Sequence, residues 1–351
     1  MDVKFLEKLS NADALAGFEG EVRQLMLKEL KPLSDEVLTD NIGSIVFKKK
    51  GTSDGPKILL DAHMDEVGFR VRNICENGQI IVKPVGAVKQ LAKFMQAVRI
   101  TTANGSKVNG FMQSTYTEDK ESKEIPGETY IDLGVSSDEE VKKLGIEVGN
   151  IVCFDSQFKN SGKNIVMGKA FDDRIGCYII ARVLENLKNK KHPNTVFVSA
   201  TSSEEVGLRG ARTVTELVKP DVGIAVDACC YKDSFDKSAK NSRQIGKGMI
   251  ITQSDKGFEC NEKLYKLIQS VANKQKTNLQ LDMFETGRTN AAKIYINGIG
   301  IPTQSCCIPL RYGHCAYSIA NTKDIEDAVK IITEVICKID AKTAKDFVSF
   351  I

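Results

Sequence analysis

The sequence predicts an α/β protein with a helix-covered, mixed and largely parallel sheet and an inserted small β-barrel or PDZ-like domain. An apolar run, Lys57–Phe69 (KILLDAHMDEVGF), ends abruptly in polar side chains, as buried strands of open α/β sheets do. After Ile165, apolar strands alternate with helix-spaced segments, which is typical of a parallel sheet covered by helices. Between them lie short alternating segments divided by Gly, Asn and Pro. We therefore expect a main domain (1–70 and 164–351) and an inserted β-rich domain (71–163).

Apolar residues at helical spacing come first and predict two short helices within residues 3–30. In the main domain we then expect, in order, strands ending at Lys50 and after Lys57, helix Ile175–Leu187, strand Thr195–Ser202, helix Ala211–Val218, strand Asp221–Asp227, helix Leu264–Ala272, strands Leu279–Met283 and Ile301–Cys306, and helix Thr322–Ile339. In the insertion we expect strands at Gln79–Pro84, Gln96–Thr101, Ser106–Met112, Glu128–Asp132 and Asn150–Phe154, and one helix, Asp138–Leu144.

Composition narrows the class of protein. The 351 residues include 49 basic and 46 acidic side chains, a net charge of +3 that argues against nucleic acid or a membrane surface as the partner. The N-terminus lacks a signal-peptide pattern, and no apolar run approaches the roughly 20 residues of a membrane span. The ten cysteines are scattered without C-x-x-C spacing, which favours free thiols. We expect a cytoplasmic enzyme.

Polar side chains stand at the ends of the predicted strands and at one helix start: His63 with Asp65, Asp172–Asp173, Glu204–Glu205, Asp227 and His314. Because the carboxyl ends of parallel strands meet at one sheet edge, these groups are expected to converge. Two imidazoles with several carboxylates form a donor set for Zn²⁺, Co²⁺ or Mn²⁺. Two ions ~3.5–4 Å apart would share one bridging carboxylate and leave one acid free as a base for hydrolysis.

Five segments in order, HMDEVG, GKAFDDR, SSEEVGLRGA, VD and RYGH, resemble the TET-type (tetrahedral) aminopeptidases. These are co-catalytic metallopeptidases that include glutamyl and deblocking aminopeptidases, and some members carry the name endoglucanase. The resemblance spans nearly the whole chain, including the N-terminal GFEGEVR and the insertion. It implies a zinc-exopeptidase-like catalytic domain, an inserted dimerisation domain, and cytoplasmic dimers that assemble into hollow homododecamers acting on peptides.

The resemblance also implies a role for each site residue. The implied metal ligands for two divalent ions per subunit (Zn or Co, with Mn as a further option) are His63, Asp172, Glu205, Asp227 and His314. Asp172 is implied as the bridging ligand, with Asp173 as the alternative, and Asp65 as the residue that orients His63. Glu204 is implied as the general base: it deprotonates a water that bridges the ions, the hydroxide attacks the first peptide carbonyl, and Glu204 protonates the departing amine.

The sequence departs from the family pattern in three places. Asn290 stands where the family commonly has an Asp, Cys315–Ala316 follow the last histidine in place of Ser-Pro, and Cys229–Cys230 follow Asp227 in place of small or hydroxyl residues. None of these departures removes an implied ligand. We expect them to bear on substrate preference and on the level of activity.

Other interpretations stay open from the residues alone. Glu204 with Asp65 could form the acid–base pair of a glycoside hydrolase, which would leave both site histidines without a role. A catalytically impaired binding protein on the same fold is favoured only by Asn290. The acid pairs could also be first-turn helix acids that complement a helix dipole. His192, in a Lys/Asn/Pro loop, and the run Glu118–Glu124 are expected in solvent, and the cysteines near the site as buried small side chains.

Overall fold

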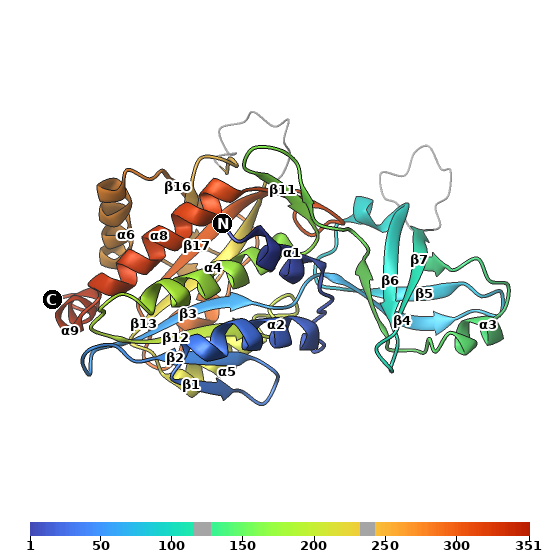
Figure 1. Ribbon diagram of the computed structural model, residues 1–351, viewed down its shortest axis with the longest axis horizontal. Coiled ribbons are helices and arrows are strands. Elements are labelled where there is room, and N and C mark those ends of the chain that lie inside the picture. The colour runs from blue at the N-terminus through green and yellow to red at the C-terminus, as the bar shows by residue number, and fades with distance from the viewer. Residues whose placement is uncertain (115–127, 232–242) are drawn as a thin grey trace.

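The computed structural model describes residues 1–114, 128–231 and 243–351. Within them, a 12-stranded sheet forms the main body and a closed barrel of six strands projects from one end of it (Figure 1). The predicted α/β class, with a mixed sheet and an inserted β-barrel, is confirmed. The predicted solvated run Glu118–Glu124 lies outside the described residues.

Four parallel strands at the centre of the main sheet determine where polar side chains meet. The main path runs in the order β1 (Glu36–Thr39), β2 (Ile45–Lys49), β12 (Thr195–Thr201), β3 (Lys57–His63), β13 (Val222–Tyr231), β17 (Thr303–Arg311), β18 (Ser318–Asn321), β11 (Ile165–Gly168) and β10 (Lys159–Asn160). Strands β12, β3, β13 and β17 are parallel to their neighbours within this group. Their carboxyl ends therefore lie at one edge of the sheet. The flanking strands on the path are antiparallel, which makes the sheet mixed.

The sheet extends beyond the predicted strands in two ways. Strand β14 (Met249–Asp255), which was not predicted, pairs antiparallel with β17, parallel with β16 (Leu279–Met283) and antiparallel with β15 (Phe258–Glu259). Strand β13 also continues past Asp227, and β17 past Cys306, because the two strands pair with each other from Gly223↔Thr303 to Tyr231↔Arg311. A local sequence pattern does not reveal this long-range pairing.

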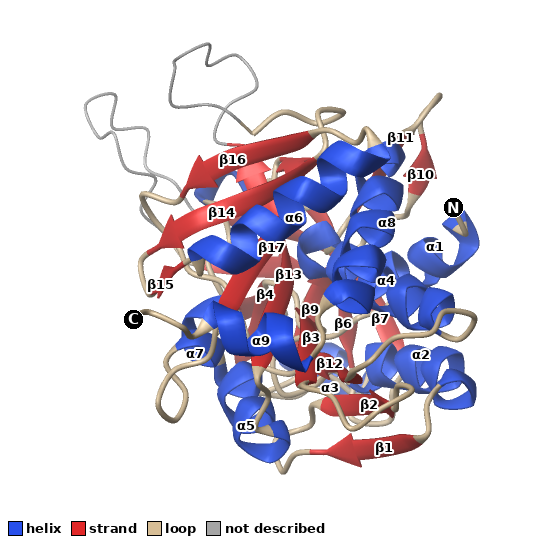
Figure 2. Cartoon of the chain, turned by 90° about the vertical axis from the view of Figure 1, so that its left-hand side faces the viewer, coloured by secondary structure: helices blue, strands red, loops and turns tan. Residues whose placement is uncertain are grey.

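Helices cover both faces of the main sheet (Figure 2). One face carries α1 (Val3–Asn11), α2 (Gly20–Leu30), α4 (Phe171–Leu187), α6 (Glu262–Gln275), α8 (Thr322–Lys338) and α9 (Ala341–Phe347), and the other carries α5 (Arg209–Val218) and α7 (Ala291–Tyr295). Strand β3 serves both layers by alternation, since Ile58 and Leu60 pack with α4 whereas Leu59 packs with α5.

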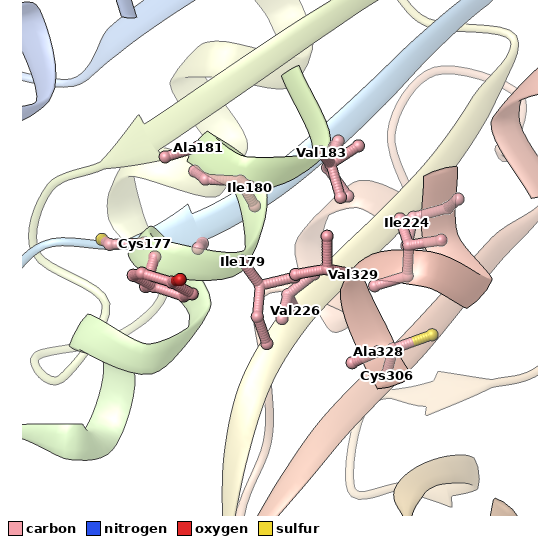
Figure 3. Packing of buried hydrophobic residues seen from close by; sticks show 14 of the residues in the cluster. Cys177, Ile179, Ile180, Ala181, Val183, Ile224, Val226, Cys306, Ala328 and Val329 are labelled. Atoms are coloured by element: carbon pink, nitrogen blue, oxygen red, sulfur yellow. The ribbon is translucent and has the colours of Figure 1, made fainter. Parts of the chain in front are cut away.

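Helix α4 is buried on nearly every side, which explains its almost continuous apolar sequence. Figure 3 shows Ile179 of α4 pointing toward Val226 of β13 and Val329 of α8, all within one buried cluster. Asp172 and Asp173, at the start of α4, have non-helical backbone angles and are joined by a cis peptide bond. Regular helix therefore begins after them, close to the predicted start, and the two acids lie in the turn that precedes it.

The inserted barrel follows β3 directly. It closes in the order β4 (Gly68–Ile74), β5 (Ile80–Val85), β8 (Thr129–Asp132), β7 (Lys107–Ser114), β6 (Gln96–Thr101) and β9 (Ile151–Phe154), with α3 (Asp138–Lys143) beside it. Its core includes Phe69 and Phe154, whose rings meet edge to face with centroids 5.8 Å apart. Arg99 of the barrel donates two hydrogen bonds to Asp13 of the main body, so the two parts are joined by a buried ion pair.

The expectation that His192 lies in solvent is wrong. Its side chain is 3% exposed, and its Nδ1 lies 3.0 Å from the backbone oxygen of Asn194. The Asn194 amide donates to the carbonyls of Ile336 and Ile339 at the end of α8. The loop is buried because its Asn194 side chain adds hydrogen bonds to carbonyls at the end of this helix. Among the described helices, none has both the length and the apolar composition required to cross a bilayer.

Candidate metal centre

The structure brings all the predicted site residues to the carboxyl-end edge of the parallel strands. The contributing segments are the end of β3 (His63, Asp65), the turn before α4 (Asp172, Asp173), the turn after β12 (Glu204, Glu205), β13 (Asp227) and the loop after β17 (His314). Two groups of potential metal-binding residues form here, one of His63, Asp173 and Asp227 and the other of Asp172, Glu205 and His314. Within each group the potential ligand atoms all lie within 4.8 Å of one another.

Asp172 occupies the position between the two groups. Its Oδ1 lies 3.2 Å from Nε2 of His63, and its Oδ2 lies 3.2 Å from Nε2 of His314. Asp173 instead turns toward the backbone, where it accepts from the N–H groups of His63 at 3.2 Å and Gly176 at 3.0 Å. Of the two neighbouring acids, Asp172 is therefore the one whose two oxygens face both imidazoles.

The remaining acids complete the two groups. Glu205 Oε1 lies 3.2 Å from Nε2 of His314, and Asp227 Oδ1 lies 3.9 Å from Nε2 of His63. Glu204 Oε2 also lies 3.9 Å from Nε2 of His63, and the residue is 8% exposed. Each imidazole thus faces Asp172 and at least one further carboxylate, and Glu204 stands beside the His63 group.

Asp65 supports the site more through the backbone than its predicted role suggests. Its carboxylate accepts hydrogen bonds from the backbone N–H groups of Glu204 at 2.9 Å and Glu205 at 3.0 Å. Nδ1 of His63 lies 3.0 Å from the backbone oxygen of Asp65 and 3.5 Å from its carboxylate. The main-chain oxygen is therefore the nearer partner of the ring, and the carboxylate holds the turn that carries both glutamates.

Burial and mutual repulsion disfavour negative charge on several of these acids. Burial raises the pKa of Glu204 well above its ordinary value, and the carboxylates of Asp227 and Glu205 raise it further, while His63 opposes the rise. Burial and the neighbouring carboxylate of Asp172 likewise raise the pKa of Asp227. A positive charge between these groups would remove the repulsion.

The same surroundings favour the charged form of the two histidines. Burial disfavours protonation of His314, but the carboxylates of Glu205 and Asp172 outweigh it and raise its pKa to about 12. For Asp172, hydrogen bonds from both histidines outweigh burial and hold its pKa well below the usual range. The site therefore draws positive charge to the space around the Asp172 carboxylate.

A second acidic group in the molecule shows what a neutralised cluster looks like. Asp13 and Glu66 are buried beside Cys153, but Lys169 forms ion pairs with both acids, at 3.1 and 2.7 Å. Arg174 adds a further pair to Glu66 at 2.9 Å. Lys169 and Arg174 neutralise the two carboxylates, so this cluster is a structural ion-pair network.

Among residues 1–114, 128–231 and 243–351, no lysine or arginine forms an ion pair with the acids at the strand ends. Their ion pairs within these ranges are with the two histidines. Oε1 of Glu205 is buried and lies 3.2 Å from Nε2 of His314, but no donor meets it with hydrogen-bond geometry. Imidazole nitrogens, several carboxylates and an unsatisfied buried oxygen fit divalent cations that prefer nitrogen and oxygen ligands.

The barrel contributes to the site through the loop that follows β5. This contribution was not predicted from the sequence. Nδ1 of His314 lies 3.1 Å from the backbone oxygen of Ala87, and Lys89 N–H donates to the His314 carbonyl at 3.1 Å. This contact orients the ring so that Nε2 faces the acids. At Gly86, with φ +74°, an added Cβ would lie 3.3 Å from Oε2 of Glu205 and 2.7 Å from Val67. The loop therefore packs directly against the site.

Several residues beside the site have left-handed backbone conformations. Ala170 (φ +54°) precedes the Asp172 turn, Ser203 (φ +60°) precedes Glu204, and Tyr312 and His314 have φ +60° and +58°. This conformation costs about 1–2 kcal/mol for a residue other than glycine, and such strain clusters at functional sites. The surrounding hydrogen bonds must offset it.

The cysteines near the site are packing groups. All ten cysteines are free; Cys229, Cys306 and Cys307 are buried as expected, whereas Cys230 and Cys315 are only partly buried. Cys230 occupies the space that a side chain at position 313 would need, since an added Cβ on Gly313 would lie 1.5 Å from its Sγ. Neither group of potential metal-binding atoms at the strand ends includes a thiol.

Asp61 provides a physical reason for Asn290. The Asn290 amide donates to Oδ2 of Asp61 at 2.7 Å and to Oγ1 of Thr201 at 2.9 Å. Asp61 is fully buried, and burial raises its pKa to about 6 although hydrogen bonds from Ser199 and Asn290 oppose the rise. An aspartate at position 290 would face another carboxylate, so an amide suits this chain.

We expect Asn290→Asp to lower the melting temperature, because it places two carboxylates together in the protein interior. The loss should correspond to about 3 kcal/mol, the order found when a buried charge is left unpaired. The exchange variant, Asp61→Asn with Asn290→Asp, should recover most of this loss, since donor and acceptor merely change places. Thermal melts at one protein concentration measure the effect. An exchange variant no more stable than Asn290→Asp would contradict the pairing.

Comparisons with known proteins agree with this geometry. The model of the family described as M42 glutamyl aminopeptidase matches residues 43–331. The chain is 30% identical over 341 residues to the lysyl aminopeptidase of Pyrococcus furiosus, covering 94% of this chain and 95% of that protein. The solved structure of a TET aminopeptidase from a marine sediment archaeon of the Thaumarchaeota is similar with a TM-score of 0.94 at 33% identity, covering 98% of this chain and 99% of that one.

Two further solved structures share this fold. The TET1 peptidase of Pyrococcus horikoshii, which assembles into a tetrahedron or a large octahedral shell, shares the fold with a TM-score of 0.84 at 22% identity, covering 96% of this chain and 99% of that one. A Thermotoga maritima protein described as an endoglucanase is similar with a TM-score of 0.80 at 26% identity, covering 97% of this chain and 99% of that one.

Proposed function

Because this chain belongs to the M42 glutamyl aminopeptidase family, it is a metallo-aminopeptidase that hydrolyses N-terminal residues, and we propose the following roles for its site residues. His63 and Asp227 would hold one divalent cation, His314 and Glu205 would hold a second, and Asp172 would supply a carboxylate oxygen to each. The observation that carries this proposal is the position of Asp172, whose two oxygens each lie 3.2 Å from a different imidazole. Zn²⁺, Co²⁺ and Mn²⁺ all suit the donor set.

Glu204 is the general base in this proposal. Bound cations would polarise the scissile carbonyl and lower the pKa of the attacking water. The Glu204 carboxylate accepts the proton of that water and then delivers it to the departing amine. Its placement supports the role, because it lies 3.9 Å from Nε2 of His63 and its backbone N–H is held by Asp65 at 2.9 Å.

A glycoside hydrolase is the less well supported alternative, although the similar Thermotoga maritima protein is described as an endoglucanase. A glycosidase requires two carboxylates that both reach the substrate. Asp65, the predicted partner of Glu204, is fully buried and accepts hydrogen bonds from two backbone N–H groups. It is therefore a structural acceptor, and this pair does not supply the second glycosidase carboxylate.

The substrate class can be tested with a panel of aminoacyl p-nitroanilides, their N-acetylated forms and carboxymethylcellulose, each assayed with added Zn²⁺, Co²⁺ or Mn²⁺. We expect turnover of substrates with a free amino terminus, because the reaction removes N-terminal residues. Acetylated substrates should react at least about 100-fold more slowly, as lost substrate positioning can produce effects of that size. Release of reducing sugar from the cellulose, without peptide hydrolysis, would overturn the proposal.

We also propose that this chain forms a homododecamer in which the inserted domain, residues 71–163, makes the dimer contacts. Solved structures with this fold include a PhTET1 dodecamer and the Pyrococcus horikoshii TET1 peptidase, which assembles into a tetrahedron or a large octahedral shell. The barrel region exposes large apolar side chains, among them Leu91 at 78%, Met95 at 63% and Val148 at 64%, and a subunit contact over them would remove apolar surface from water. Light scattering after size exclusion should give the mass of twelve chains, and Met95→Lys with Val148→Lys should lower it. A stable wild-type monomer would contradict this proposal.

A further inference from the structure

We propose that Glu19, in the N-terminal segment, is a positioning residue whose carboxylate holds the turn after β12 and so sets the place of Glu204. The inference rests on the proposed role of Glu204 as general base. Glu19 stands at the start of α2, far from Glu204 in the sequence.

The contacts of Glu19 are directed at the turn. The residue is fully buried, and its side chain does not cap α2. Oε1 instead accepts hydrogen bonds from the Ser202 hydroxyl at 2.6 Å, the Ser203 N–H at 3.1 Å and the Gly17 N–H at 2.8 Å. Two of these three donors belong to the residues that directly precede Glu204.

The carboxylate is itself held in place. Oε2 of Glu19 lies 3.5 Å from the Arg23 guanidinium, one helical turn along α2. Arg23 Nε donates to the carbonyl of Gly43 at 2.7 Å. The guanidinium packs against Gly43, where an added Cβ would lie 2.6 Å from its Nη2. Glu19 is therefore a fixed acceptor.

Two acids from different segments together hold three consecutive backbone N–H groups. Glu19 accepts from Ser203, and Asp65 accepts from Glu204 and Glu205. The turn needs this support because Ser203 has φ +60°, a conformation that serine rarely adopts. If the contact with Glu19 were lost, Ser203 could relax to an ordinary conformation and rotate the following residue. A displacement of about 1 Å at a catalytic group can reduce turnover by about 100-fold.

The experiment compares Glu19→Ala, Glu19→Gln and Ser202→Ala with Glu21→Ala as the matched control. Glu21 is a nearby acid on the same helix, but its carboxylate contacts the Asp13 N–H and Lys107. Glutamine keeps the accepting oxygen of Glu19, whereas alanine removes it. The measurements are kcat and KM of the metal-loaded enzyme on an aminoacyl p-nitroanilide, and hydrogen–deuterium exchange by mass spectrometry on the metal-free protein.

We expect Glu19→Ala to lower kcat by about 10- to 100-fold with little change in KM, and to speed exchange in the peptide that contains residues 203–205. Glu19→Gln should have a kcat within about 5-fold of wild type, because the accepting oxygen of glutamine keeps Glu204 close to its place. Ser202→Ala should show a smaller change of the same kind, and Glu21→Ala none.

Three results would overturn the inference: unchanged kcat and exchange in Glu19→Ala, equal loss in Glu19→Gln and Glu19→Ala, or the same local exchange in Glu21→Ala. If Glu19→Ala does not fold, hydrogen–deuterium exchange in Ser202→Ala decides the question. Unchanged exchange at residues 203–205 in that variant would overturn the inference. The exchange readout needs no catalysis. A wild-type protein without peptidase activity would therefore refute the proposed function while the exchange measurement still tests the hold on the turn.

Discussion

Glu204→Gln should lower kcat for aminoacyl substrates by about 1,000-fold or more, because a positioned general base contributes about 10²- to 10⁴-fold. Glutamine keeps the size of the side chain and leaves the proposed metal ligands in place, but it cannot accept the proton. Elemental analysis should therefore find the same metal content in the variant as in the wild type. Steady-state kinetics with saturating metal provides the measurement.

Glu216→Gln is the matched control for this variant. Glu216 is an exposed acid on α5, the helix that follows the Glu204 turn, and it contacts Asn297. Its replacement should leave kcat unchanged. If Glu204→Gln retained activity within about 10-fold of wild type, well under the usual contribution of a general base, another group would have to serve as the base. The proposed mechanism would then be wrong even though the family assignment stands.

Removal of metal should abolish turnover and lower the melting temperature together. Both effects have one cause, since the site gathers carboxylates without a lysine or arginine partner among the described residues. A cation at one hundred times its dissociation constant stabilises the folded state by about 2.7 kcal/mol. Dialysis against a chelator followed by addition of Zn²⁺, Co²⁺ or Mn²⁺ should reverse both losses. Calorimetry and the chromogenic assay measure them on the same samples.

Asp172→Asn separates the proposed bridge from a general effect of chelation. The variant should lose turnover, and its melting temperature should respond much less to added metal than that of the wild type. Asp138→Asn, at a partly exposed acid on α3 that pairs with Lys142, should keep the full response. A metal response in Asp172→Asn equal to that of wild type would show that the cations bind elsewhere.

Much of the fold could be predicted because its signals are local. The buried strand β3 and the helix α4 are recognisable from short runs of side chains, and the barrel from the change to short alternating segments. Strand β14 and the full length of β13 were missed because their pairing partners lie far away in the sequence. The burial of His192 was missed for the same reason, since its loop meets the end of α8.

The candidate site could be predicted in composition and only partly in geometry. Acids and histidines at strand ends have a sequence signature, so the convergence of His63, Asp172 and His314 was anticipated. The backbone oxygen of Ala87 that orients His314 has no such signature, because every residue has a carbonyl group. The pairing of Asn290 with Asp61 was invisible because it joins residues 229 positions apart.

The sequence by itself determined which elements form, which side chains carry the chemistry and to which family the chain belongs, because these follow from local periodicity and from ordered motifs. Only the tertiary structure decided how the side chains are held: Asp172 between two imidazoles, Asp65 and Glu19 on one turn, and the barrel loop against His314. The reason is that positioning depends on hydrogen bonds between segments that chain folding alone brings together.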